Sequence, residues 1–131
     1  MPAHASLVIR ACAGFDLIVT GLLALPFSAP VFVSALYALS GAHSAPELPG
    51  IAWFFVNLAG ALGVLWALVR IARPEPWLAR ADALGRCAVA TLIAGYLITG
   101  ALPALMAAFV ASELLGAGAQ AWVLRRRTPQ V

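Results

Sequence analysis

One apolar stretch near the C-terminus strongly limits what this chain can fold into. From Ala104 to Leu124 the sequence contains a single charged residue, Glu113, and three consecutive arginines follow it. As an α-helix rising about 1.5 Å per residue, the stretch reaches roughly 31 Å, which matches the hydrocarbon core of a bilayer. A basic run at the end of such a segment marks the side that is not translocated. We therefore predict a transmembrane helix whose C-terminal end faces the cytoplasm.

The composition extends this interpretation to the whole chain of 131 residues. Hydrophobic residues make up 63% and charged residues 10%, whereas soluble domains average about 45–50% and about 25%. The mean hydropathy is +0.98. All eight basic residues are arginines that flank apolar runs, so the net charge of +3 indicates membrane orientation and not binding of nucleic acid. We predict one membrane domain without a separate soluble core.

The breaks between apolar runs predict three further spans. Pro26 and Pro30 end the first run, and Gly100 with Pro103 divides the last run into two helices. The apolar segment 30–40 is too short to cross a bilayer, so we expect it to form a helix at the outer surface. The predicted fold is all-α. It is an integral membrane four-helix bundle with this short interfacial helix and with spans at about 7–25, 51–71, 84–100 and 104–124.

The connection between the second and third spans is polar and contains prolines. Its residues from Trp77 onward are expected to form a short helix at the membrane interface. Asp82 and Arg86 are four residues apart, so they would stabilise each other there. This interpretation places Arg86 at the level of the lipid headgroups.

The distribution of arginine predicts the orientation of the chain. Four spans put both termini on one side of the membrane. If that side is the cytoplasm, all eight arginines flank cytoplasmic ends and the outer loops contain none. We therefore expect a multi-pass protein of the inner (plasma) membrane with both termini cytoplasmic and the loop 26–50 outside. His43 and Glu47 in that loop are interpreted as solvated side chains.

Small and polar residues recur at every fourth position in three of the spans, which places each set on one helix face. Small side chains let helix backbones approach closely, and hydroxyl groups form hydrogen bonds across the contact. We expect all three faces to point inward. The sets are Cys12, Asp16 and Thr20; Cys87, Thr91, Gly95 and Thr99; and Ala108, Ser112 and Gly116.

Polar residues at similar depth in the spans predict one buried cluster. An ionised carboxylate inside a bilayer is costly unless it is paired, protonated or facing water, so Asp16 and Glu113 are the strongest candidates. The predicted cluster holds no intramembrane base, and we expect at least one of these acids to be protonated. The other members are also ordinary packing partners in a helix bundle. The candidate ligand-binding or proton-binding residues are Asp16, Glu113, Asn57, Tyr96, Thr91 and Thr20.

The cysteines do not predict a disulfide framework. Cys12 and Cys87 both lie near predicted cytoplasmic ends of spans, where thiols stay reduced. A soft-metal site that combines them with His4 needs three coincidences, so we predict no metal and no cofactor. The sequence also lacks a Gly-rich phosphate loop, a Cys-x-x-Cys, a His-x-x-x-His and a Gly-x-Ser-x-Gly pattern.

Three classes of function fit these features. The first is a small-molecule binder or proton-coupled carrier that uses the buried cluster. The second is an accessory or scaffold subunit of a larger membrane complex. The third is an enzyme acting on lipid or isoprenoid, with Asp16 and Glu113 as acid and base. No nucleophile or cofactor fingerprint supports an enzyme, so we rank it last. The expected partners are the lipid bilayer and either a second copy of the chain or a membrane complex.

Overall fold

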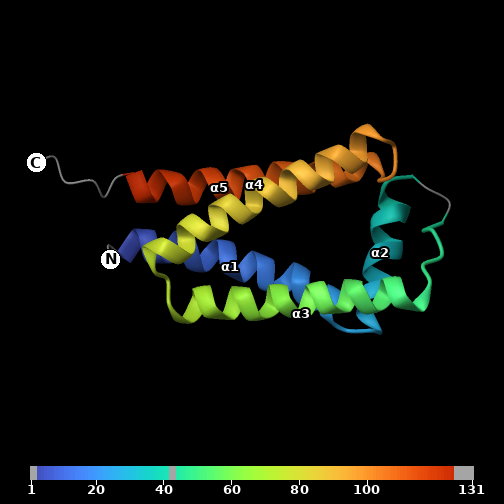
Figure 1. Cartoon of the computed structure of the whole chain (residues 1–131), viewed down its shortest axis with the longest axis horizontal. Helices are drawn as coiled ribbons and strands as arrows, with labels where there is room; N and C mark the ends of the chain where they lie inside the picture. The colour runs from blue at the N-terminus through green and yellow to red at the C-terminus, as the bar shows by residue number, and fades with distance from the viewer. Residues whose placement is uncertain (1–2, 42–43, 126–131) are drawn as a thin grey trace, which may run out of the picture.

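The computed structural model describes residues 3–41 and 44–125, and in these ranges every regular element is helical. The predicted all-α fold is therefore confirmed. The elements, shown in Figure 1, are α1 (Ala3–Ala24), α2 (Ser28–Leu39), α3 (Gly50–Ala72), α4 (Pro76–Ile98), the short 3-10 helix η1 (Ala104–Met106) and α5 (Ala107–Arg125).

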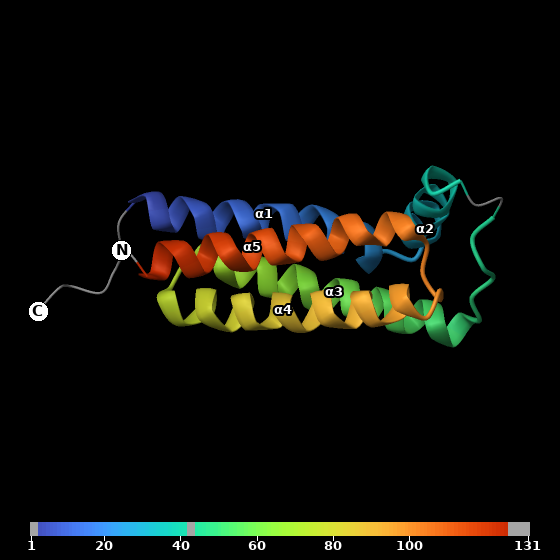
Figure 2. The ribbon, with the colours of Figure 1, turned by 90° about the horizontal axis from the view of Figure 1, so that it is seen from above.

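Four segments of the described chain are long and apolar enough to cross a membrane. They comprise α1, α3, α4 and η1 with α5, which run alongside one another (Figures 1 and 2). The start of α1 and the end of α5 lie at the same end of the bundle, whereas α2 and the turn between α4 and α5 lie at the other end. This arrangement supports a multi-pass membrane protein built as a four-helix bundle.

Two glycines end helices where the sequence indicates. Gly41 follows α2 with φ +80°, and Gly100 follows α4 with φ +71°. Both values lie in the left-handed region, which glycine adopts without the steric cost that a Cβ would bring. The N–H of Gly100 donates to the carbonyl of Leu97, and the N–H of Ala101 donates to that of Tyr96, which closes the end of α4.

The third long helix differs from its predicted range of 84–100. Helix α4 begins at Pro76, because proline fits the first turn of a helix without losing an intrahelical hydrogen bond. It continues without a break to Ile98. Asp82 and Arg86 are 6% and 5% exposed, so these polar residues lie inside the bundle and not in an interfacial segment. Arg86 therefore occupies the middle of a continuous helix, which corrects its expected place at the headgroups.

The long helices form two close pairs. Helix α1 packs along α3 and α4 packs along α5, whereas the main contact between the pairs is the smaller one of α1 with α5. At Gly60 the backbones of α3 and α1 are so close that a Cβ would overlap Leu23 and Ala24. Nearby, the amide of Asn57 donates to the carbonyl of Leu23 over 2.8 Å. This carbonyl belongs to the last turn of α1, where helix carbonyls lack partners of their own.

Few large apolar side chains are buried in the interior of the bundle. The buried apolar residues are mostly alanines, whereas large residues such as Leu7, Ile18 and Leu92 are exposed on the outside of the bundle. Because lipid is as apolar as leucine, burial of such residues does not drive helices together in a membrane. Close packing of small residues and polar contacts must hold the bundle instead.

Candidate functional site

Charged side chains from all four long helices meet inside the bundle. Trp66 and Gln120 also belong to this group, because both donate hydrogen bonds to the carboxylate of Asp82. We call these seven residues the charged cluster. Its members are Asp16 of α1, Trp66 and Arg70 of α3, Asp82 and Arg86 of α4, and Glu113 and Gln120 of α5.

Asp82 accepts more hydrogen bonds than any other carboxylate of the charged cluster. Its Oδ2 accepts from Nη1 of Arg70 at 2.6 Å, from Nε of Arg86 at 2.9 Å and from Nε2 of Gln120 at 2.6 Å. Its Oδ1 accepts from the indole Nε1 of Trp66 at 2.8 Å. Donors from three helices and from both helix pairs therefore converge on one carboxylate.

Arg86 joins all three carboxylates of the charged cluster. Beside its contact with Asp82, Nη2 donates to Oδ2 of Asp16, and Nη1 donates to Oε2 of Glu113 at 3.0 Å. Gly116 makes room for it, because a Cβ there would lie 2.9 Å from Nη1. The predicted small-residue face of α5 thus points inward at Gly116, where it admits a guanidinium group, whereas Ala108 of the same set is exposed.

Arg70 completes the link between the two helix pairs. Its Nη2 donates to Oδ2 of Asp16 at 2.6 Å, while Nη1 binds Asp82 on the opposite pair. The guanidinium carbon lies 5.7 Å from the centroid of the Trp66 ring, within the range of a cation–π contact. Arg70 is 1% exposed although it lies in the last turn of α3, so its long side chain extends into the bundle and not toward the nearby helix end.

The formal charges of the charged cluster do not cancel. Three carboxylates face two guanidinium groups, which leaves one excess negative charge if all are ionised. The compensation is uneven, because Asp82 and Asp16 each contact both arginines whereas Glu113 contacts only Arg86 among the described residues. Glu113 is therefore the carboxylate with the weakest electrostatic support.

An open cavity of about 490 Å³ adjoins the charged cluster. All five charged members line it, and Asp16 and Glu113 keep 16% and 18% of their side-chain surface accessible. The rest of the lining is supplied by Thr20, Gly63, Trp66, Ala81, Gly85 and Val89. The cavity thus draws residues from both helix pairs and gives a small molecule access to the charges.

The structure brings together three of the six residues that the sequence singles out. Asp16 and Glu113 are joined through Arg86, and Thr20 lines the same cavity with its hydroxyl bonded to the carbonyl of Asp16 at 2.7 Å. Asn57 lies elsewhere, in the contact with Leu23 at the other end of α1. The expectation that the cluster contains no base was wrong, because both Arg70 and Arg86 belong to it.

Thr91 and Tyr96 lie apart from the charged cluster. Both are exposed and line a shallow groove on α4 together with Gly95 and Thr99. The hydroxyl of Thr91 donates to the carbonyl of Cys87 within the same helix, so it needs no partner across a helix contact. The prediction that this face of α4 points inward was therefore wrong. Equal depth in the membrane did not imply a shared face.

A second periodic stripe on α4 identifies the inward face correctly. Leu78, Asp82, Arg86 and Ala90 also recur at every fourth position, and all four are buried. A charged pair costs far more to leave in lipid than hydroxyl groups do, so this stripe should have been preferred over the one containing Thr91. Likewise Gln120 follows Glu113 by seven residues, which places both on one face of α5. Nothing in the sequence pattern indicates the inward turn of Arg70.

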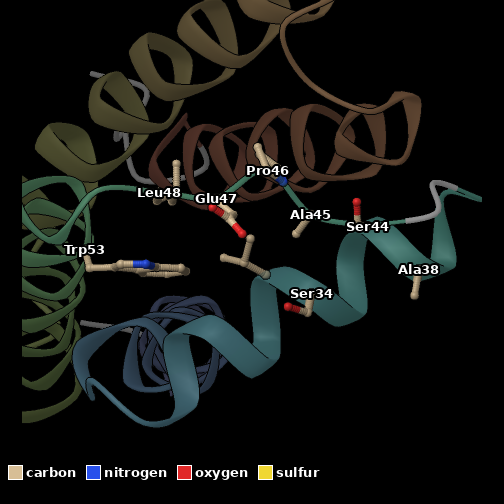
Figure 3. Close-up of a pocket in the computed structure, with 9 residues that line it drawn as sticks. Ser34, Ala38, Ser44, Ala45, Pro46, Glu47, Leu48 and Trp53 are labelled. Atoms are coloured by element: carbon tan, nitrogen blue, oxygen red, sulfur yellow. The ribbon is translucent and has the colours of Figure 1, made fainter.

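A larger cavity of about 660 Å³ lies at the other end of the bundle, between α2 and the loop before α3 (Figure 3). Its lining includes Ser34, Ser44, Glu47 and Trp53. Among the described residues that line it, only Glu47 is titratable, and this side chain is exposed, as predicted. His43 lies outside the described residues. We therefore place the candidate functional site at the charged cluster and not in this larger cavity.

In the part of the chain that the structure describes, no group of three His, Cys, Asp or Glu side chains is placed to hold a metal ion. Cys12 is half-buried and Cys87 is exposed, each as a free thiol. Comparisons with protein families, with curated proteins and with solved structures give no match to this chain.

Proposed function

We propose that this chain is a small-molecule binder of the inner membrane that works as a proton-coupled carrier, with the charged cluster as its site. The observation that carries this proposal is the odd number of charges beside an open cavity. An excess carboxylate in low-dielectric surroundings either takes up a proton or pairs with a bound ligand, so one site can exchange the two. The arginine distribution supports cytoplasmic termini.

Glu113 is the proposed carrier of the exchangeable proton. It has a single charged contact, Arg86 at 3.0 Å, and its second carboxylate oxygen accepts no hydrogen bond from the described residues. Asp82, by contrast, accepts from four donors that include both arginines, which favours its ionised form. Release of the proton from Glu113 would leave a carboxylate facing the cavity.

The placement of the charged cluster also links ligand binding in the cavity to the arrangement of the two helix pairs. Three of its contacts cross between the helix pairs: Arg70 to Asp82, Trp66 to Asp82, and Arg86 to Asp16. The direct packing between the pairs is less extensive than that within each pair, so these polar bonds are a large part of what holds the pairs together. A ligand that competes for Asp16 or Arg86 would loosen one pair from the other, which is the motion that a carrier needs.

Difference infrared spectroscopy of the purified chain in lipid tests the exchangeable proton. We expect one protonated carboxyl group at neutral pH, which titrates reversibly and disappears in Glu113→Gln while thermal stability stays near that of the wild type. Glutamine keeps a hydrogen-bonding side chain but cannot ionise, so it separates a working acid from a purely structural one.

Glu47→Gln is the matched control, because Glu47 is an exposed loop carboxylate. Its removal should leave the protonated carboxyl signal unchanged. If every carboxyl group of the wild type instead titrates near the ordinary value of about 4, no buried proton exists and the proposal fails.

One observation favours the second candidate, an accessory subunit of a membrane complex. The face of α4 that contains Cys87, Thr91, Gly95 and Thr99 is exposed and presents small or hydroxyl-bearing residues, which are typical of contacts between transmembrane helices. Affinity purification in mild detergent separates the candidates. A stoichiometric second polypeptide favours the subunit, whereas a single chain that retains the titrating carboxyl favours the carrier.

A further inference from the structure

We propose that the ligand of the charged cluster is a small organic cation, a protonated amine with an apolar body, which binds in the cavity lined by Asp16, Glu113 and Trp66. This inference rests on the proposed function and names its substrate class. It is drawn from the charges, the unused hydrogen-bonding atoms and the lining of that cavity.

Two carboxylates that line the cavity each keep one oxygen without a hydrogen bond. Oδ1 of Asp16 and Oε1 of Glu113 accept no hydrogen bond from the described residues, and both side chains line the cavity. Oε1 of Gln120, which is fully buried, is also without a donor. The arginine nitrogens are mostly engaged: Arg86 binds carboxylates through Nε, Nη1 and Nη2, and Arg70 through Nη1 and Nη2, while Nε of Arg70 has no partner. Unused acceptors call for a ligand that donates N–H groups.

The charge of the site selects a cation. With Glu113 deprotonated, the charged cluster carries one excess negative charge, so a ligand with one positive charge makes it neutral. An anion would meet guanidinium groups that are already paired with carboxylates and would add to the excess negative charge. In the exchange, the carboxylic acid proton of Glu113 leaves to solvent and the ammonium group of the ligand takes its place. No covalent bond of the ligand changes.

The remaining lining indicates an organic ligand and not a bare metal ion. Guanidinium groups stand between the carboxylates, and no set of three ligating side chains occurs in the described residues. Trp66 is 36% exposed, and its ring is held in place by the bond to Asp82, so it offers a fixed apolar surface beside Val89. The volume of about 490 Å³ falls within the usual range for small-molecule pockets.

Gly85 provides a way to fill the cavity without touching the charges. It lines the cavity, and a Cβ built on it would have no atom within 4 Å. A leucine there should occupy ligand space while the ion pairs remain. Gly118 on α5 is the matched control, because it is exposed, also has open space at its Cβ, and lines none of the described cavities.

The test is isothermal titration calorimetry of the full purified chain with three probes of similar shape: phenethylammonium, phenethyl alcohol and 3-phenylpropionate. We expect the ammonium probe to bind at least about tenfold more tightly than the other two, because only it supplies both the charge and the N–H donors. Repeating the titration in two buffers of different ionisation enthalpy should show one proton released per ligand bound.

The cavity variants test where the probe binds. Gly85→Leu should weaken binding of the ammonium probe by about tenfold or more, Gly85→Ala by less, and Gly118→Leu should leave it unchanged. Thermal unfolding curves of the same samples check that each variant is folded. Glu113→Gln should abolish the released proton and weaken binding.

Each outcome bears on one of the two proposals. Binding of none of the probes, tighter binding of 3-phenylpropionate, or equal binding by folded Gly85→Leu overturns the organic-cation inference, even if the infrared signal of Glu113 is present. Selective ammonium binding that releases no proton supports the organic-cation inference and overturns the proton coupling of the proposed function.

Discussion

Replacement of Arg86 by methionine would test whether the charged cluster holds the bundle together. Methionine keeps an unbranched apolar stem but removes the charge and every donor. The wild-type side chain is 5% exposed and donates to Asp16, Asp82 and Glu113, which belong to three different helices. The variant leaves Arg70 as the one guanidinium in contact with the described carboxylates.

Two considerations set the size of the effect on the free energy of unfolding. Three hydrogen bonds to charged groups, at about 1.5–3 kcal/mol each, give a gross loss of more than about 4 kcal/mol. A carboxylate that loses its partner can instead take up a proton, which at pH 7 costs about 1.4 kcal/mol for each pH unit above its ordinary pKa of about 4. Protonation therefore limits the decrease in the free energy of unfolding to about 4 kcal/mol at pH 7. We expect Arg86→Met to destabilise the chain by about 3–4 kcal/mol at pH 7, within the range for breaking a buried ion pair.

The destabilisation caused by Arg86→Met should depend on pH. The folded variant binds one more proton than the folded wild type, and the unfolded chains bind equal numbers. The stability of the variant relative to the wild type therefore falls as pH rises, by about 1.4 kcal/mol per unit between roughly pH 4 and pH 7. At pH 5 the destabilisation should therefore shrink to about 0.3–1.3 kcal/mol.

Equilibrium unfolding by SDS in mixed micelles at pH 5 and pH 7 measures both values. Arg80→Met is the control, because Arg80 is an exposed arginine of the same helix, and its effect should stay within about 0.5 kcal/mol. Adding Glu113→Gln to Arg86→Met removes the least compensated carboxylate and should recover part of the loss. A destabilisation below about 1 kcal/mol at pH 7, or one that does not change with pH, would refute the electrostatic account.

Three further predictions concern packing and orientation. Gly60→Ala should destabilise the detergent-solubilised chain by about 1–3 kcal/mol because its Cβ overlaps the backbone of α1, whereas Gly21→Ala, which has open space, should be nearly silent in thermal unfolding. Gly116→Leu should lower the stability of the chain by about 1–3 kcal/mol, because its side chain would displace the guanidinium of Arg86. Leu115→Val, at a position that is 74% exposed, should lower it by less than about 0.5 kcal/mol. Equal effects would mean that the inward face of α5 is assigned wrongly. In a cysteine-free chain on intact cells, a cysteine at Ser44 should react with an impermeant thiol reagent, and one appended at the C-terminus should react only after lysis; the reverse pattern would invert the predicted orientation.

Local sequence signals were sufficient for much of the fold. The span length, the proline breaks and the glycine stops depend on neighbouring residues alone, and Gly41 and Gly100 adopt the positive φ that such stops require. The start of α4 was the exception. Polarity from Trp77 to residue 83 suggested an interfacial segment, but Asp82 is buried and accepts hydrogen bonds from two other helices. Polarity alone could not separate a residue facing water from one facing partners inside the bundle.

The sequence by itself therefore determined the all-α class, the number of spans and the two acids, Asp16 and Glu113, whose burial requires a partner. Only the tertiary structure decided what those partners are. A helix face is defined by angle as well as depth, so Thr91 and Tyr96, at the expected level, turn outward while Arg86 turns in. The arginines near the ends of apolar runs have side chains long enough to reach either water or the interior. Arg70 reaches inward because the carboxylates of Asp16 and Asp82, brought together from two other helices, stabilise its charge there.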